Sequence, residues 1–171
     1  YTGRAAEIGI AEVHQALCAN GLRDKVILRC SGAHQTGSDV VKSALMGGES
    51  FEFGTTALMM LKCVMAKNCN IKCPAGLTTK PEVFDGDPRA LGQYLLNIAH
   101  EVREILAELG LKSLAEAKGR CDLLHLLDHP SSVGQLDLRA MLTLVNEHKV
   151  DDPIYMERDF EIDDSFINIV R

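Results

Sequence analysis

The distribution of apolar residues predicts that the chain begins with a helix followed by a buried strand. Residues 4–19 carry apolar side chains at roughly the 3.6-residue period of an amphipathic helix, and Asn20-Gly21 is typical of its end. The next apolar run, residues 26–30, is short and begins with β-branched residues, as in a buried parallel strand. It leads into the small residues Ser31-Gly32-Ala33, which favour a turn.

The order of strand, turn and helix is repeated immediately afterwards. Thr36 is placed to cap a helix over residues 37–46. Residues 50–53 predict a second strand, Gly54-Thr55 a second turn, and residues 56–67 another helix. This alternation indicates parallel strands with helices packed outside the sheet.

Residues 87–109 form the longest periodic segment and predict a long helix. Pro88 suits its first turn, and Gly110 marks its end. Its glutamates, Glu101 among them, are expected on the solvent face, where ion pairs add little stability.

Two shorter helices are expected after it. Ser113 and Glu116 have the spacing of a capping box, which predicts a helix over residues 113–118. Residues 136–145 favour a short helix over a strand, and the acidic tail that follows carries no clear pattern.

Composition narrows the classes of function. The chain has 171 residues, a net charge of -6 and no Trp, which argues against a nucleic-acid surface. No apolar run approaches the roughly 20 residues of a membrane span, and no signal-peptide pattern opens the chain. Six cysteines without secretory features favour a reduced, cytoplasmic setting. Because the first residue is Tyr1 and not Met, a processed or partial chain is expected.

The two small-residue turns have the composition of a phosphate site. In (β/α)8 barrels, the turns after the last two strands and a nearby helix N-terminus commonly hold a ligand phosphate, because small residues let backbone N–H groups approach the anion. Each turn alone is weak support, since any strand-to-helix turn needs small residues. Together, one helix apart, Ser31-Gly32-Ala33 and Gly54-Thr55 make such a site as plausible as a structural role.

Three cysteines follow the second turn at close spacing. Cys63, Cys69 and Cys73 are separated by five and then three residues, and Pro74 follows the last. Three thiolates without a nearby histidine fit an iron–sulfur cluster better than zinc, which usually takes four ligands. Cys18, Cys30 and Cys121 fall singly in apolar patterns and are expected to be buried, inert thiols.

Residues 6–119 resemble the C-terminal part of the FMN-binding synthase domain of the glutamate synthase large subunit. The order and spacing of several motifs carry the resemblance. They are residues 7–17, Thr36-Gly37, residues 39–41, Phe53-Gly54-Thr55, residues 63–66, Cys69, Cys73-Pro74, residues 101–104 and Leu109-Gly110.

The resemblance implies an oxidoreductase that holds FMN and a 3Fe-4S cluster. The family reduces 2-iminoglutarate, formed from 2-oxoglutarate and ammonia, to L-glutamate. A glutaminase domain releases the ammonia from glutamine, and a ferredoxin or an NAD(P)H-oxidising subunit supplies electrons. The cluster ligands would fall on Cys63, Cys69 and Cys73, and the FMN phosphate turns on Ser31-Gly32-Ala33 and Gly54-Thr55. No catalytic residue is assigned, although His34 would lie at the catalytic face.

The chain departs from the family pattern at both sites. The family usually has four residues between its second and third cluster cysteines, whereas three stand here between Cys69 and Cys73. Its first turn usually reads Asp-Gly-Gly, and the carboxylate is absent from Ser31-Gly32-Ala33.

The fold class expected is α/β, as the last two βα units of a flavin-binding (β/α)8 barrel with a C-terminal helical extension. A closed barrel takes about 250 residues and eight strands, so the rest of the barrel is expected on residues outside this chain or on another chain. Residues 1–120 would form the partial barrel domain, with the iron–sulfur loop at 63–73, and residues 121–171 the extension.

Two other classes of function stay open. One is a flavin-free iron–sulfur subunit for electron transfer or assembly. The other is a non-catalytic interaction module, with or without bound zinc, that has a degenerate flavin site. Flavin bands with iron–sulfur absorption, iron–sulfur absorption alone, or a colourless zinc protein would distinguish the three.

Overall fold

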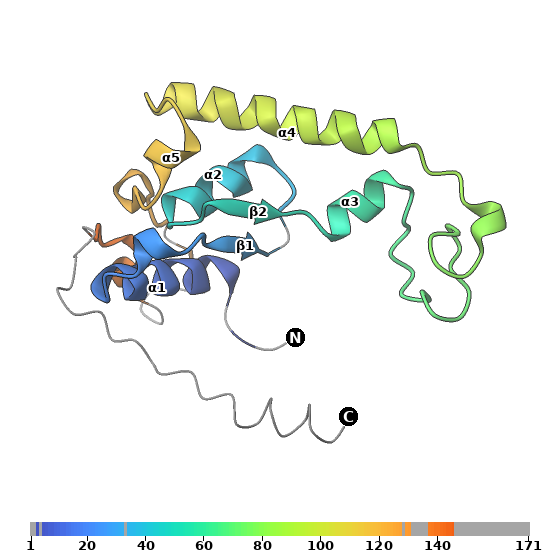
Figure 1. Ribbon diagram of the computed structural model, residues 1–171, viewed down its shortest axis with the longest axis horizontal. Coiled ribbons are helices and arrows are strands. Elements are labelled where there is room, and N and C mark those ends of the chain that lie inside the picture. The colour runs from blue at the N-terminus through green and yellow to red at the C-terminus, as the bar shows by residue number, and fades with distance from the viewer. Residues whose placement is uncertain (1–2, 4, 33, 128, 131–136, 146–171) are drawn as a thin grey trace, which may run out of the picture.

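The computed structural model describes residues 3, 5–32, 34–127, 129–130 and 137–145. Over these residues the chain is a helix-rich α/β structure around one small parallel sheet (Figure 1). In the view of Figure 1, helix α1 lies below the strands, α2 lies above them, and α4 crosses the top of α2. The expected α/β class is therefore confirmed for the described residues.

The two expected strands form and pair in parallel, but both are short. Strand β1 is Arg29–Ser31 and β2 is Ser50–Glu52, with Cys30 opposite Phe51. The prediction that the first strand starts at residue 26 was wrong: Ile27 is 77% exposed. A strand needs a neighbour along its whole length, and β2 reaches back only far enough to pair from Arg29 onward.

The flanking helices start and end where their capping residues lie. Helix α1 is Ala6–Ala19 and α2 is Gly37–Leu45, close to the expected bounds. Thr36 and Asp39 form a capping box: the Thr36 hydroxyl accepts from the Asp39 N–H at 3.2 Å, and the Asp39 carboxylate accepts from the Thr36 N–H at 3.0 Å.

The core lies where α4, Pro88–Glu108, packs on α2. Asp87 caps α4, Pro88 occupies its first turn, and the following helix α5 is Leu114–Ala117. Apolar residues of the three helices form one buried cluster. Its members are Val40, Val41, Ala44, Leu45, Ile98, Val102, Leu106 and Ala117. Burying each large side chain contributes on the order of 1.5 to 3 kcal/mol, so this cluster is the main source of stability.

The first half of α4 has no such cover from the described residues. Leu95 and Leu96 are exposed there, and on the nearby helix α3 so are Leu58 and Met59. The periodic apolar positions of α4 are therefore buried only in part: Ile98, Val102 and Leu106 are buried, whereas Leu95 is exposed. Within the described ranges, no helix has the length and apolar content needed to cross a membrane.

Helix α3 is much shorter than the periodicity predicts. It spans Thr55–Met60, and the expectation that it continues to residue 67 was wrong. Lys62, Met65 and Lys67 adopt left-handed backbone angles, with φ of 72°, 54° and 58°. An α-helix cannot pass through such residues, so the chain leaves the helix and forms the loop that carries the three cysteines.

The remaining described helices are short 3₁₀ segments. They are Arg23–Lys25, Pro81–Val83, Cys121–Leu123 and Arg139–Leu142. The predicted helix over residues 136–145 is thus reduced to one 3₁₀ turn, and its first residue, Leu136, lies outside the described residues.

Glu101 holds the start of α2 and does not face solvent as expected. Its carboxylate accepts from the backbone N–H groups of Gly37 at 2.7 Å and Ser38 at 3.3 Å. These are orphan donors of the first helical turn, where the helix dipole also favours negative charge. The periodicity of α4 could not reveal this contact, because the partner is 64 residues away in sequence.

Arg23 is the most buried charged residue of the described chain, at 2% exposure. Its guanidinium donates to His14 Nδ1 at 3.0 Å, to the Val26 carbonyl at 3.0 Å, to the Gly47 carbonyl at 2.8 Å and to the Glu49 carboxylate at 2.8 Å. Burial, with the positive charges of Arg23 and Lys118, lowers the pKa of His14, so its Nδ1 is an acceptor at neutral pH. One side chain thus ties α1 to the start of both strands.

Replacing Arg23 by Met is expected to loosen this part of the fold strongly. Removing one partner of a buried ion pair costs about 3 to 5 kcal/mol, because the other groups stay desolvated and unpaired. Amide hydrogen exchange of residues 20–50 in R23M should therefore accelerate roughly a hundredfold or more. The matched control is R29M, which removes the exposed Arg29–Glu52 pair and should change exchange little. Equal effects of the two variants would contradict the central role of Arg23.

Glu101→Gln is expected to weaken the start of α2. A neutral amide keeps an acceptor but loses the charge at the helix N-terminus, at a cost of about 1 kcal/mol. The amides of Gly37 and Ser38 should then exchange several times faster. Glu104→Gln, on an exposed position of the same helix, is the control and should leave these amides unchanged. If both variants behave alike, the carboxylate contact has no stabilising role.

Candidate functional site

The parallel pairing brings the two small-residue turns to one edge of the sheet. Ser31 ends β1 opposite Glu52 near the end of β2, so Gly32 and Gly54 leave the sheet on the same side. Gly54 is the residue before α3, and no described side chain caps that helix through a hydrogen bond. Ala33, the third residue of the first turn, lies outside the described residues.

The turns do not share one hollow. Gly32 lines a cavity of about 230 Å³ together with side chains from α1 and α2, among them Glu7, Asp39 and Lys42. Thr55 instead lines the hollow of the cysteine loop. Gly32 also has a packing role, because a Cβ at this position would come within 2.3 Å of the Ala6 Cβ.

The start of α2, which follows the first turn, has little capacity left for an anion. The N–H groups of Gly37 and Ser38 already bind Glu101, and those of Gln35 and Thr36 bind the Asp39 carboxylate at 3.0 Å each. A phosphate at this edge would therefore depend on the two turns themselves and on the uncapped start of α3.

His34, the histidine singled out from the sequence, is a structural link. It is 3% exposed, and its ring nitrogens lie 2.9 Å from the Ser43 hydroxyl and 3.2 Å from the Glu52 carbonyl oxygen. Its ring also packs against Phe51 and Phe53. His34 thus connects the first turn, β2 and α2, and both ring nitrogens are already engaged.

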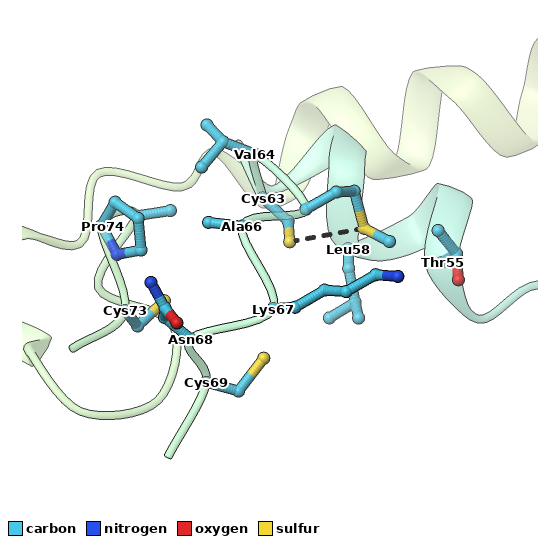
Figure 2. Close-up of a pocket in the computed structure, with 12 residues that line it drawn as sticks. Thr55, Leu58, Cys63, Val64, Ala66, Lys67, Asn68, Cys69, Cys73 and Pro74 are labelled. Atoms are coloured by element: carbon cyan, nitrogen blue, oxygen red, sulfur yellow. Dashed lines mark hydrogen bonds between the residues drawn. The ribbon is translucent and has the colours of Figure 1, made fainter. Parts of the chain in front are cut away.

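The three predicted cluster cysteines line one hollow beside α3 (Figure 2). The hollow has a volume of about 140 Å³, and its other walls are largely apolar, including Leu58, Val64 and Pro74. On this measure one water molecule needs about 10 to 15 Å³, so the space suits a group of several atoms better than a single ion. Cys63 is partly exposed, Cys69 is exposed and Cys73 is buried.

A single turn contains one of these cysteines and ends just before the next. The Lys72 N–H donates to the Asn68 carbonyl at 3.1 Å, and the Ile71 N–H donates to the same oxygen at 3.3 Å, so the turn spans residues 68–72 and Cys73 follows it. Cys69 and Cys73 both line the hollow, whereas Ile71 is 85% exposed.

Cys73 lies among hydrogen-bond donors. Burial favours its neutral form, but the neighbouring polar groups of Thr78, Ala75 and Leu77 outweigh burial and lower the pKa of the thiol. Successive N–H groups that converge in a loop form an anion-binding nest. The surroundings of Cys73 thus favour a thiolate.

The donor set fits an iron–sulfur cluster, although the thiols are not gathered around a common point. Among the described residues, no three His, Cys, Asp or Glu side chains lie close enough together to hold a metal ion. Three thiols on one hollow, without a carboxylate or imidazole, nevertheless match cluster chemistry and not that of a hard cation. All six cysteines are free, and burial raises the pKa of Cys30 and Cys121, as expected for inert thiols.

Sequence reasoning missed two polar residues at this site. Thr78 and Thr79 follow the last cysteine and bond to the cysteine backbone: the Thr78 hydroxyl donates to the Cys69 carbonyl, and the Thr79 hydroxyl accepts from the Cys73 N–H at 2.8 Å. The adjacent pair of hydroxyl residues just after Cys-Pro was the available signal.

Comparison with known proteins identifies close relatives of the matched region. A family model described as "Conserved region in glutamate synthase" matches residues 1–112, which include both turns and all three cysteines. The NADPH glutamate synthase large chain of Bacillus subtilis is 45% identical over 150 residues, which are 83% of this chain and 10% of that protein. The ferredoxin-dependent glutamate synthase of Pyropia yezoensis is 48% identical over 129 residues, covering 72% of this chain and 8% of that protein.

A plant relative matches this chain over a similar share of both sequences. Ferredoxin-dependent glutamate synthase 1 of Arabidopsis thaliana is 42% identical over 151 residues, covering 85% of this chain and 9% of that protein. The chain therefore spans about a tenth of the length of these relatives.

The two turn glycines are expected to respond differently to an added methyl group. Gly32→Ala forces α1 to shift at Ala6, which should cost about 1 to 3 kcal/mol, whereas Gly54→Ala meets nothing within 4 Å and should stay within about 0.5 kcal/mol. Hydrogen exchange of residues 6–19 in the flavin-free protein measures the difference. Equal exchange in the two variants would contradict the close packing of Gly32.

Proposed function

This chain belongs to the glutamate synthase family, and from that premise we propose that it forms the last two βα units of a flavin-binding (β/α)8 barrel in a glutamate synthase large chain. The observation that carries the proposal is the position of Thr55. This residue belongs to the second small-residue turn and also lines the cysteine hollow. The proposed flavin edge and the cysteine loop are thus joined through one residue.

The exposed apolar surface supports a larger barrel. A two-stranded parallel sheet leaves both strand edges open, and parallel sheets occur almost only where both faces are covered. Large apolar side chains on α3, the cysteine loop and the first half of α4 are also uncovered by the described residues. They include Leu58, Met59, Val64, Met65, Leu95 and Leu96.

Each cofactor has its own set of residues in the proposal. The backbone of Ser31, Gly32, Ala33, Gly54 and Thr55 would hold the FMN phosphate, and Cys63, Cys69 and Cys73 would hold the iron–sulfur cluster. When bound, FMN supplies hydride transfer and the cluster supplies one-electron transfer. The chain's own contribution is to hold both groups in place. The nest around Cys73 stabilises a thiolate there, and α3 fixes the spacing between the second turn and Cys63.

The reaction proposed for the whole protein is the reduction of 2-iminoglutarate to L-glutamate. Its ammonia would come from glutamine at a glutaminase domain, and its electrons from a ferredoxin or an NAD(P)H-oxidising subunit. The names of the relatives include both NADPH and ferredoxin as electron source. This segment would receive electrons at the cluster, and it is common to the NADPH-dependent and the ferredoxin-dependent relatives.

A flavin-free iron–sulfur electron-transfer unit is the second candidate, and one observation favours it. The N–H groups at the start of α2 are already bound by Glu101 and Asp39, which leaves fewer donors for a phosphate. The cysteine hollow does not depend on these groups, so this candidate retains the cluster and loses only the flavin.

Serine variants of the three loop cysteines are expected to lose the cluster. In the full-length protein, C63S, C69S and C73S should each lose most of their iron and the broad iron–sulfur absorption, because a serine hydroxyl is a poor replacement for a thiolate ligand. The control is C121S, since Cys121 is buried away from the hollow. Iron analysis and visible spectra measure the result, and flavin bands in the same spectra distinguish the two candidates. A colourless wild-type protein that contains zinc would contradict both.

A further inference from the structure

Two hydrogen bonds tie the small-residue turns to each other. His34 directly follows the first turn, and its ring Nδ1 lies 3.2 Å from the carbonyl oxygen of Glu52, the last residue of β2. A carbonyl oxygen can only accept, so Nδ1 carries the hydrogen and donates it. Thr56 directly follows the second turn, and its hydroxyl donates to the His34 carbonyl at 3.1 Å, across 22 residues of sequence. The segments that flank the two turns are thus bonded in both directions.

The acceptor of the Thr56 hydroxyl is itself held in place. The His34 ring is buried, and its Nε2 lies 2.9 Å from the Ser43 hydroxyl on α2. The same ring packs against Phe51 and Phe53, with ring centroids 5.8 and 5.9 Å away. Because these contacts fix the residue that carries the carbonyl, the hydrogen bond from Thr56 also fixes where the second turn lies.

The preceding threonine has a different environment. Thr55 is exposed, and its hydroxyl makes no hydrogen bond to any residue that the structure describes. Thr56 is half-buried, and its hydroxyl hydrogen is already donated within the protein. Thr55 can therefore meet a ligand, whereas Thr56 serves the link between the turns.

We propose that Thr56 is a positioning residue that fixes the second small-residue turn relative to the first and thereby sets a preference for phosphorylated flavin over riboflavin. The inference rests on the proposed function of the two turns and extends it to a residue outside both of them.

The preference follows from the cost of ordering the turns. A phosphate held by backbone N–H groups of two chain segments needs both segments at one fixed separation. Ordering a segment at the moment of binding reduces affinity, so a hydrogen bond that orders it beforehand favours the phosphorylated ligand. Riboflavin has the same ring system without the phosphate, so its affinity does not depend on this separation. A general weakening of the fold would instead lower both affinities alike.

The test compares Thr56→Val, Thr56→Ser and Thr55→Val in the full-length protein, with any flanking domains present. Val keeps the shape of Thr without the hydroxyl, and Ser keeps the hydroxyl. The first readout is the pair of dissociation constants for FMN and riboflavin, measured by flavin fluorescence after bound flavin has been removed. The second is amide hydrogen exchange of residues 34–36 and 53–57 in the flavin-free protein, which depends on neither flavin nor activity.

A remote control is Thr143→Val. Thr143 is exposed, and its hydroxyl donates to the Arg139 carbonyl, four residues earlier. This variant removes a threonine hydroxyl bond away from both turns and should leave both readouts unchanged.

The expected result in T56V is exchange roughly fivefold faster, as for one lost hydrogen bond, and FMN affinity lower by a similar factor. Riboflavin affinity should stay at its wild-type value. T56S should match the wild type in both readouts, and T55V should keep wild-type exchange because its hydroxyl bonds to no described residue.

Four results would overturn the inference. They are unchanged exchange or unchanged FMN affinity in T56V, an equal loss of FMN and riboflavin affinity in T56V, a T56S variant that behaves like T56V, and exchange in T55V as fast as in T56V. A wild-type protein that binds FMN no better than riboflavin would contradict the proposed function of the turns. Faster exchange in T56V would then show that Thr56 links the turns without serving phosphate binding, and unchanged exchange would exclude both roles.

Discussion

A buried guanidinium must have nearly all its donors paired, and in this chain that constraint falls on Arg23. Its partners come from α1, from the approach to β1 and from the approach to β2, so these segments must all be correctly placed before the charge is compensated. Glu49 extends the set, because its second oxygen accepts from Lys118 beyond α5. The two strands are short, and the Arg23 contacts fix the segments that lead into both of them.

The helices could be predicted from the sequence wherever local rules decide. The bounds of α1, α2, α4 and α5 follow from apolar spacing and from the capping residues Thr36, Asp87 and Ser113. The wrong predictions concern residues whose structure depends on partners distant in sequence or on backbone angles. Residues 26–28 look like a strand, but the parallel pairing with β2 begins only at Arg29, and α3 ends just before Lys62 adopts a left-handed conformation. Arg23 and Glu101 look like surface residues, because their partners are remote in sequence.

The same distinction between local sequence patterns and long-range contacts applies to the candidate site. The cysteine spacing was enough to predict a shared site, and the three thiols do line one hollow. Parallel pairing was enough to predict that the two turns lie at one edge. Periodicity does not describe packing between segments. Three features depend on such packing: the contact of Glu101 with the start of α2, the burial of His34, and the hydrogen bonds of Thr78 and Thr79 to the cysteine backbone.

The shortened spacing between Cys69 and Cys73 still leaves both residues on the wall of one hollow. The Asn68–Lys72 hydrogen bond closes a turn over residues 68–72, which contains Cys69, and Cys73 follows directly, with its N–H bound by the Thr79 hydroxyl. The left-handed residues Met65 and Lys67 then carry the chain back to Cys63, and such strained positions persist where a site requires them. The spacing and the strain are thus two parts of one loop geometry that directs its thiols into the hollow.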